Sequence, residues 1–266
     1  HDWYRRLPKA IEPTIRHIKS IRKCKTHFLI MELFYAQHIF SKDETLTFNS
    51  EESRHLCKVL RKKIGDLIRV TDGKGLEWIG EIIEINTQKV VAKKSQFILH
   101  KNNRTSLHIA ISPTKNNDRF EWFIEKATEI GVSEITPIVC NHSEKKTLKP
   151  ERLKKILISG IKQSAQFFLP ILHPTIFFEA FINQDLPKTK LIAHCQKGNK
   201  LPLQEVRNLD NEVLIMIGPE GDFSKLEIEN AQNQFFTEIT LGSQRLRTET
   251  AGLVACSKVA TLREIL

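Results

Sequence analysis

The sequence lacks the features that mark several large classes of protein. It has no run of 18 apolar residues, so no segment is predicted to cross a bilayer as a helix. Five scattered cysteines form no CxxC pair and have no clustered histidine partners, which argues against a disulfide framework and a zinc site. We therefore expect a protein of the reducing cytoplasm, without a metal and without a membrane partner.

Three common catalytic or nucleotide-binding motifs are also missing. GxxxxGK[ST] is absent, which excludes a P-loop, and no GxSxG nucleophile elbow occurs. The GxG of Gly73–Gly75 lies in a predicted hairpin turn, so it does not form a Rossmann fingerprint. Single histidines such as His142 and His194 are expected to be structural or surface groups.

Positive charge is what the chain has in excess. Its formal net charge is +10 with 27% charged and 40% hydrophobic residues, a globular composition that favours a polyanionic partner. Residues 1–30 hold eight Lys or Arg against Asp2 and Glu12. We interpret 1–30 as a basic extension outside the fold, with a transit peptide or an RNA-binding arm as the alternative.

Residues 31–103 are predicted to form a small β-rich domain. A short helix capped by Asn49 or Ser50 runs through Val59, and strands follow at 67–71, 78–85 and 89–93. The turn at 72–75 supplies glycines for a tight hairpin. Between the helix and the predicted barrel lies a basic cluster, which is either a solvated face or a phosphate-contacting patch; its members are Arg54, His55, Lys58, Arg61, Lys62 and Lys63.

Residues 104–266, after a polar linker at 101–105, alternate between strands and helices. Asp118 with Glu121 predicts a capping box and Gly131 a helix end, while Pro150 opens a second helix. Such alternation predicts an α/β domain with a mostly parallel sheet covered on both faces. The expected strands are 107–111, 135–140, 191–194, 213–217 and 238–241, and the expected last helix is 253–262.

Two loops that follow predicted strands are the candidates for a ligand-binding site. One is Gly218–Ser224, and the other runs from Leu241 to Gly252 with two arginines beside a Thr-Glu-Thr triplet. Ligands of parallel α/β sheets bind at the carboxyl ends of strands, where both loops lie. Ordinary strand-to-helix turns would explain the glycines and the Ser224–Glu227 cap, but not a glutamate held between proline and glycine.

These loops resemble a known family, the ribosomal RNA small subunit methyltransferase E family of the SPOUT superfamily. GPEGDFS at 218–224 resembles the family's GPEGG[FL]S, with Asp222 in place of a glycine, and LRTETAG at 246–252 matches its signature. DRFEWFIEKATEIGV at 118–132 resembles the family's first helix of this domain. One departure is Ser243-Gln244-Arg245, where many members have Pro-Arg and an aliphatic residue.

The resemblance implies a SPOUT-type parallel sheet with a C-terminal trefoil knot, preceded by a PUA-like β-barrel. It also implies a homodimer that uses S-adenosylmethionine (SAM) to methylate N3 of one uridine near the 3′ end of 16S rRNA in the 30S subunit. The residues implied for cofactor binding are Ile217, Gly218, Pro219, Glu220, Gly221, Leu241, Gly242, Leu246, Arg247 and Thr250.

Catalytic roles remain open between two interpretations. Glu249 is a candidate base and Arg247 a candidate for stabilising a uracil anion or a phosphate. The alternative is a structural Arg–Glu pair at the start of the last helix. A second class of function, a non-catalytic RNA-binding or assembly factor, also remains; SAM binding would discriminate between the two.

Overall fold

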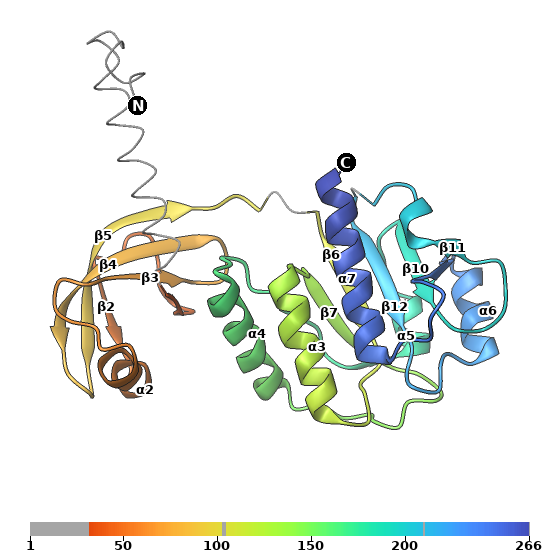
Figure 1. Ribbon diagram of the computed structural model, residues 1–266, viewed down its shortest axis with the longest axis horizontal. Coiled ribbons are helices and arrows are strands. Elements are labelled where there is room, and N and C mark those ends of the chain that lie inside the picture. Colours follow the sequence, from red (N-terminus) through yellow and green to blue (C-terminus); the bar gives the residue numbers. More distant parts are fainter. Residues whose placement is uncertain (1–31, 103–104, 210, 266) are drawn as a thin grey trace, which may run out of the picture. The chain divides into compact units, whose positions relative to one another are not determined.

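The computed structural model describes residues 32–102, 105–209 and 211–265, which form two compact units (Figure 1). The first unit holds the described residues up to Asp72 together with Leu76–Leu99. The second holds Gly73–Gly75 and the chain from His100 onward. The expectation for 1–30 lies outside the described residues. Within the described part, no helix combines the length and the apolar character needed to cross a membrane.

The first unit is built on a five-stranded sheet in the order β1-β3-β4-β5-β2. β1 runs parallel to β3, and the other neighbouring strands are antiparallel. The fully buried Trp78 fills its core, where the indole Nε1 donates to the carbonyl of Asp43 at 3.0 Å. The elements are β1 (Leu33–Tyr35), β2 (Thr45–Phe48), α2 (Ser50–Arg54), η2 (His55–Val59), β3 (Leu67–Thr71), β4 (Leu76–Ile85) and β5 (Val90–Leu99).

The predicted short helix of this unit is confirmed, with a change of pitch inside it. Asn49 is the N-cap, and its side-chain oxygen accepts from the backbone N–H of Glu52 at 2.9 Å. α2 then continues directly into the π-helical turn η2, which ends at Val59. The strand expected at 89–93 extends further, to Leu99, because it pairs along the whole of β4.

The second unit is a parallel sheet in the order β11-β13-β10-β12-β6-β7-β8, with β9 also paired to β7. Its strands are β6 (Leu107–Ile111), β7 (Glu134–Val139), β8 (Ile171–Leu172), β9 (Ile176–Phe177), β10 (Thr189–Ala193), β11 (Leu201–Pro202), β12 (Val213–Ile217) and β13 (Thr237–Thr240). Its helices are α3 (Asn117–Ile130), α4 (Pro150–Ser164), α5 (Phe178–Ile182), η3 (Leu203–Glu205), α6 (Lys225–Asn233) and α7 (Thr248–Ile265).

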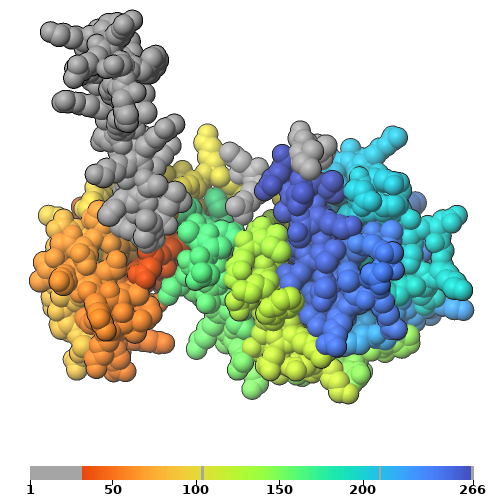
Figure 2. Space-filling model, viewed as in Figure 1, coloured from red at the N-terminus to blue at the C-terminus, as the bar shows by residue number. Residues whose placement is uncertain are grey.

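Helices cover both faces of this sheet, as the alternating pattern predicted. α3, α4 and α7 pack on one face around Phe123, and α5 and α6 pack on the other around Phe223 (Figure 1). Alternate residues of the central strand β12 enter the two cores, which makes the strand fully apolar. In the space-filling view, α3 and α7 form adjoining stripes on the surface of the unit (Figure 2).

Two predicted helix starts are wrong. The N-cap of α3 is Asn116, whose side chain accepts from the N–H of Asp118, and Glu121 binds Arg152 instead of closing a capping box. α7 begins at Thr248, earlier than the expected 253, because the Thr248 hydroxyl donates to the carbonyl of Gly218 at 3.0 Å. The Ser224–Glu227 capping box and the left-handed Gly131 at the end of α3 are as predicted.

Candidate functional site

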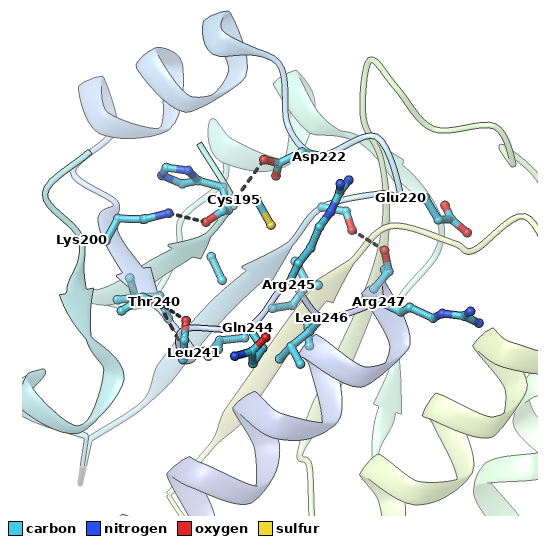
Figure 3. Close-up of a pocket in the computed structure, with 18 of the residues that line it drawn as sticks. Cys195, Lys200, Glu220, Asp222, Thr240, Leu241, Gln244, Arg245, Leu246 and Arg247 are labelled. Carbon is cyan, nitrogen blue, oxygen red and sulfur yellow. Dashed lines mark hydrogen bonds between the residues drawn. The ribbon is translucent and has the colours of Figure 1, made fainter. Parts of the chain in front are cut away.

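A cavity of about 640 Å³ opens at the carboxyl ends of the neighbouring strands β10, β12 and β13 (Figure 3). Pockets of this size accommodate small-molecule ligands. The loops that follow the three strands form its walls, so the fold itself brings them together. The lining residues are Ala193, His194, Cys195, Lys200, Ile217, Gly218, Pro219, Glu220, Asp222, Ile239, Thr240, Leu241, Gly242, Ser243, Gln244, Arg245, Leu246, Arg247, Thr248 and Ala251.

The loop after β12 is fixed through Asp222, the residue that departs from the family pattern. Asp222 has a φ of +64°, a left-handed conformation that aspartate tolerates better than most residues. Its Oδ2 accepts from the backbone N–H of Cys195 and its Oδ1 from that of Phe223, both at 2.9 Å. The carboxylate therefore joins the loop after β12 to the loop after β10.

Three further side chains join this loop and the start of α6 to neighbouring segments. The Glu220 Oε1 accepts from the backbone N–H of Lys115 at 3.0 Å, and His142 Nδ1 donates to the carbonyls of Gly221 and Asp222. The buried Glu227 accepts from the N–H of Asn141 at 2.8 Å. Hydrogen bonds to three neighbouring segments thus fix the loop after β12.

The loop after β13 is held more loosely. Gly242 has a φ of +150°, which favours glycine, and its N–H and carbonyl both bond to the Thr240 hydroxyl. From Gly242 to Arg245 every residue is exposed. Figure 3 shows the Arg245 side chain crossing the cavity toward the loop of Glu220, whereas the Arg247 side chain points away from the cavity.

Most of the residues predicted to bind a cofactor lie together in this cavity. The exceptions are Gly221 and Thr250, which do not line it. The space beside Gly221 belongs to His142, because a Cβ there would lie 2.9 Å from the His142 Cβ. Thr250 lies within the early part of α7, half-buried.

Sequence reasoning missed the third wall of the cavity, formed by the loop after β10. His194 lines the cavity, although its ring has the structural role expected for it, since Nε2 donates to Glu238 at 2.7 Å. Lys200 donates to the carbonyls of His194 and Gln196. The sequence did contain a signal for this wall. The strand expected at 191–194 precedes the loop, and in a parallel sheet its carboxyl end lies at the same edge as those of the other two strands.

The structure separates the two candidate catalytic residues. Arg247 is exposed, while Glu249 is only 6% exposed, in the first turn of α7. Glu249 Oε1 lies 3.9 Å from Arg119 Nε of α3, and Oε2 is buried without a hydrogen-bond partner among the described residues. The ion-pair partner found for Glu249 is therefore Arg119 instead of Arg247, and Arg119 was missed by sequence reasoning.

The basic cluster of the first unit lies on α2, η2 and the turn that follows. Its members are exposed except for Lys62, which is half-buried and reaches Glu32 at 4.0 Å. Arg61 has a φ of +53°, so the chain turns sharply there. The cluster therefore presents its charges to solvent, as both interpretations of it require.

Among the described residues, one group has the side-chain types and spacing to hold a metal ion: His108, Glu134 and His173. Its polar atoms already bond to protein groups: His173 Nε2 donates to Glu134 at 2.8 Å, and His108 Nε2 is hydrogen-bonded to the Thr136 hydroxyl at 2.7 Å. Burial lowers the pKa of His108 to about 4, so the ring is neutral at pH 7. A hydrogen-bonded network accounts for this group.

Comparisons with known proteins agree with the geometry. A family model described as an RNA methyltransferase domain matches residues 100–260, and one described as an RNA methyltransferase PUA domain matches 48–95. Ribosomal RNA small subunit methyltransferase E of Buchnera aphidicola subsp. Acyrthosiphon pisum is 31% identical over 224 residues, covering 81% of this chain and 87% of that protein.

Two crystal structures are similar over nearly their whole length. A probable rRNA-methyltransferase from Porphyromonas gingivalis is 38% identical with a TM-score of 0.82, covering 88% of this chain and 99% of that one. Ribosomal RNA small subunit methyltransferase E from Neisseria gonorrhoeae, bound to S-adenosyl methionine, is 27% identical with a TM-score of 0.78, covering 87% and 98%. The chain therefore belongs to the ribosomal RNA small subunit methyltransferase E family.

Proposed function

We propose that the protein transfers a methyl group from SAM to N3 of a uridine near the 3′ end of 16S rRNA in the small ribosomal subunit. The observation that carries this proposal is the cavity at the carboxyl edge of β10, β12 and β13, whose walls hold the family's two signature loops. The Neisseria gonorrhoeae relative, a methyltransferase of ribosomal RNA by name, binds SAM.

The cavity has the chemistry that SAM requires. Apolar side chains of Ile217, Leu241 and Leu246 provide surface for an adenine ring, and Glu220 and Asp222 provide carboxylates for the cationic part of the molecule. The loop after β12 is already positioned by hydrogen bonds, so little conformational entropy is lost there on binding. When bound, SAM supplies an electrophilic methyl group on a sulfonium.

The chain's own residues must orient the uridine and remove its imide proton. Alignment alone accounts for much of such a rate enhancement, and a general base adds about 10²–10⁴-fold. We assign the exposed Arg247 to the target nucleotide or its phosphate, and the unpartnered Oε2 of Glu249 to the proton. If Glu249 is the base, Glu249→Gln should lower kcat and flatten the rise of kcat with pH. If Glu249 only forms a structural pair with Arg119, the same variant should lower the melting temperature instead.

We also propose that the chain after β13 is threaded into a trefoil knot. The contact between Thr248 and the Gly218 carbonyl supports this topology, because it returns the segment to the loop after β12. True knots are rare, and no periodicity in a sequence predicts one.

A homodimer is proposed through α3 and α7. These helices adjoin on one surface (Figure 2), where Trp122 is 46% exposed and Leu253 and Val254 are half-buried in the single chain. Light scattering at micromolar concentration should give twice the chain mass, and Trp122→Glu should give the monomer; a monomeric wild type would contradict this arrangement.

The first unit is proposed to bind rRNA phosphates through its basic cluster. Replacing Arg61, Lys62 and Lys63 with alanine should reduce the slope of log affinity against log salt by up to about three units. Replacing Lys197, an exposed lysine of the second unit outside the cavity, serves as the control. An unchanged slope in the triple variant would make the cluster a solvated face.

The product provides the decisive test. Small subunits that lack the modification are incubated with the protein and SAM, followed by primer extension near the 16S 3′ end and nucleoside mass spectrometry. A methyl on N3 blocks the pairing edge and stops reverse transcriptase one nucleotide before the base, whereas a ribose methyl is read through. Arg247→Ala should remove the stop. A methyl on ribose or on another base would contradict the assignment. SAM binding without any product would also contradict it, and would favour a non-catalytic RNA-binding factor.

A further inference from the structure

Arg245 occupies an unusual place for an arginine. It lines the cavity, it is exposed, and its side chain extends across the opening toward the loop of Glu220 and Asp222 (Figure 3). Throughout the part of the chain that the structure describes, no ion pair or hydrogen bond of its guanidinium is found.

The two acidic residues opposite Arg245 already have partners. Both oxygens of Asp222 accept backbone N–H groups, from Cys195 and Phe223, and Glu220 Oε1 accepts from Lys115. Hydrogen bonds of this kind hold the two carboxylates against their loops. The guanidinium therefore retains its full capacity to donate to an anion that enters the cavity, and a bidentate bond to a carboxylate is the arrangement that its planar fork favours.

The other cations of the cavity are not placed to do this. Lys200 donates to two backbone carbonyls, those of His194 and Gln196, which fixes its ammonium at the loop after β10. Arg247 points away from the cavity (Figure 3). The lining thus combines two fixed carboxylates with one arginine that reaches across the opening.

We propose that Arg245 binds the α-carboxylate of the methionyl group of SAM and so makes affinity depend on that group; the inference rests on the proposed cofactor. SAM carries two positive groups, the sulfonium and the ammonium, and one carboxylate. The carboxylates of Glu220 and Asp222 keep their negative charge and further lone pairs beside those hydrogen bonds, which match the positive groups, and Arg245 matches the carboxylate. Arg245 is in this view a positioning residue for the cofactor, closing over it from the loop after β13.

Calorimetry with two ligands tests this assignment. S-adenosylhomocysteine contains the amino acid part, and 5′-methylthioadenosine lacks it. Arg245→Ala should weaken S-adenosylhomocysteine about tenfold or more and leave methylthioadenosine within about twofold. Arg245→Lys, which keeps the charge but loses the fork, should fall between Ala and wild type, and Arg245→Ile, the residue type common in the family, should behave as Ala does.

The control is Arg207→Ala, which removes an exposed arginine of the same unit that does not line the cavity. Equal loss for both ligands, or no loss for either, would overturn the inference. If Arg245→Ala keeps its S-adenosylhomocysteine affinity but lowers kcat/KM for the ribosomal subunit, the arginine faces RNA phosphate and the inference is wrong. A wild-type protein that binds neither ligand would refute the proposed function itself.

Discussion

The two loops of the cavity differ in how they are held, although each follows a strand of the same sheet. The loop after β12 is fixed by Asp222, Glu220 and His142, through hydrogen bonds to three other segments of the unit. The loop after β13 is exposed over 242–245, where Thr240 supplies the hydrogen bonds at Gly242. A fixed wall fits a preformed pocket, and a looser one allows entry and closure.

This difference predicts in which loop a substitution should reduce stability and ligand affinity most. In the fixed loop, a change displaces several hydrogen bonds together, because the bonds of Glu220, Asp222 and His142 all hold the same short segment. In the loose loop, a change should alter contacts with the ligand while the fold remains intact.

The largest effect is expected for Gly221→Val. The added Cβ would lie 2.9 Å from the His142 Cβ and would separate that ring from the carbonyls it bonds. Overpacking of this kind costs about 1–3 kcal/mol, so SAM affinity measured by calorimetry should fall about 5- to 150-fold. Gly221 does not line the cavity, so the loss comes from moving the loop.

Gly198→Val is the matched control for this variant. Gly198 also lies in a loop of the second unit, and its Cβ would meet one atom at 4.0 Å, from Glu238. SAM affinity should remain within about twofold of wild type, and the salt dependence of RNA binding should be unchanged in both variants. Wild-type SAM affinity in Gly221→Val would show that the loop after β12 is not rigid.

The fixed elements are also the ones that the sequence predicts best. The strands at 107–111 and 213–217 have the predicted bounds, because central parallel strands buried on both faces are continuous apolar runs. The Ser224–Glu227 capping box is local and was predicted from four residues. The placing of both loops at one sheet edge follows from the parallel direction of their strands.

What could not be predicted depends on contacts between distant segments. The early start of α7 at Thr248 rests on the carbonyl of Gly218, and the Glu249 carboxylate lies beside Arg119 of α3. The bond from Cys195 to Asp222 joins two loops that no periodicity relates. Local propensity decides where elements form, but such pairings depend on the packed fold.

The next largest effect is expected at Asp222. Asp222→Ala removes both N–H acceptors and keeps a strained φ of +64°, so SAM affinity should fall about tenfold or more. Asp222→Gly, the residue type of the family, should lose less, because glycine adopts this φ without strain. Calorimetry and melting temperatures of both variants test the order; an equal loss would mean that backbone strain at this position has no influence.

A smaller effect is expected in the loose loop. Gly242→Ala meets no atom within 4 Å of the new Cβ, so its cost is limited to the φ of +150°, about 1 kcal/mol. SAM affinity should fall about fivefold, with the melting temperature changed by a few degrees at most. A loss as large as that of Gly221→Val would remove the distinction between the two loops.

The smallest effect concerns a thiol at the junction of the walls. Cys195 is exposed and lines the cavity, whereas Cys140 and Cys256 are buried, and burial raises the pKa of Cys256 to about 12. Among the four cysteines that the structure describes, an alkylating reagent should therefore modify Cys195 first, since the thiolate is the reactive form and needs access. If the loop after β13 closes over the ligand, saturating S-adenosylhomocysteine should slow this alkylation several-fold, as followed by peptide mass spectrometry.

The half-buried Cys57 of the first unit supplies an internal reference, because its rate should not depend on the ligand. Slowing at Cys57 as well would indicate a reagent effect, and an unprotected Cys195 in protein known to be saturated would show that the looser wall stays open around its ligand.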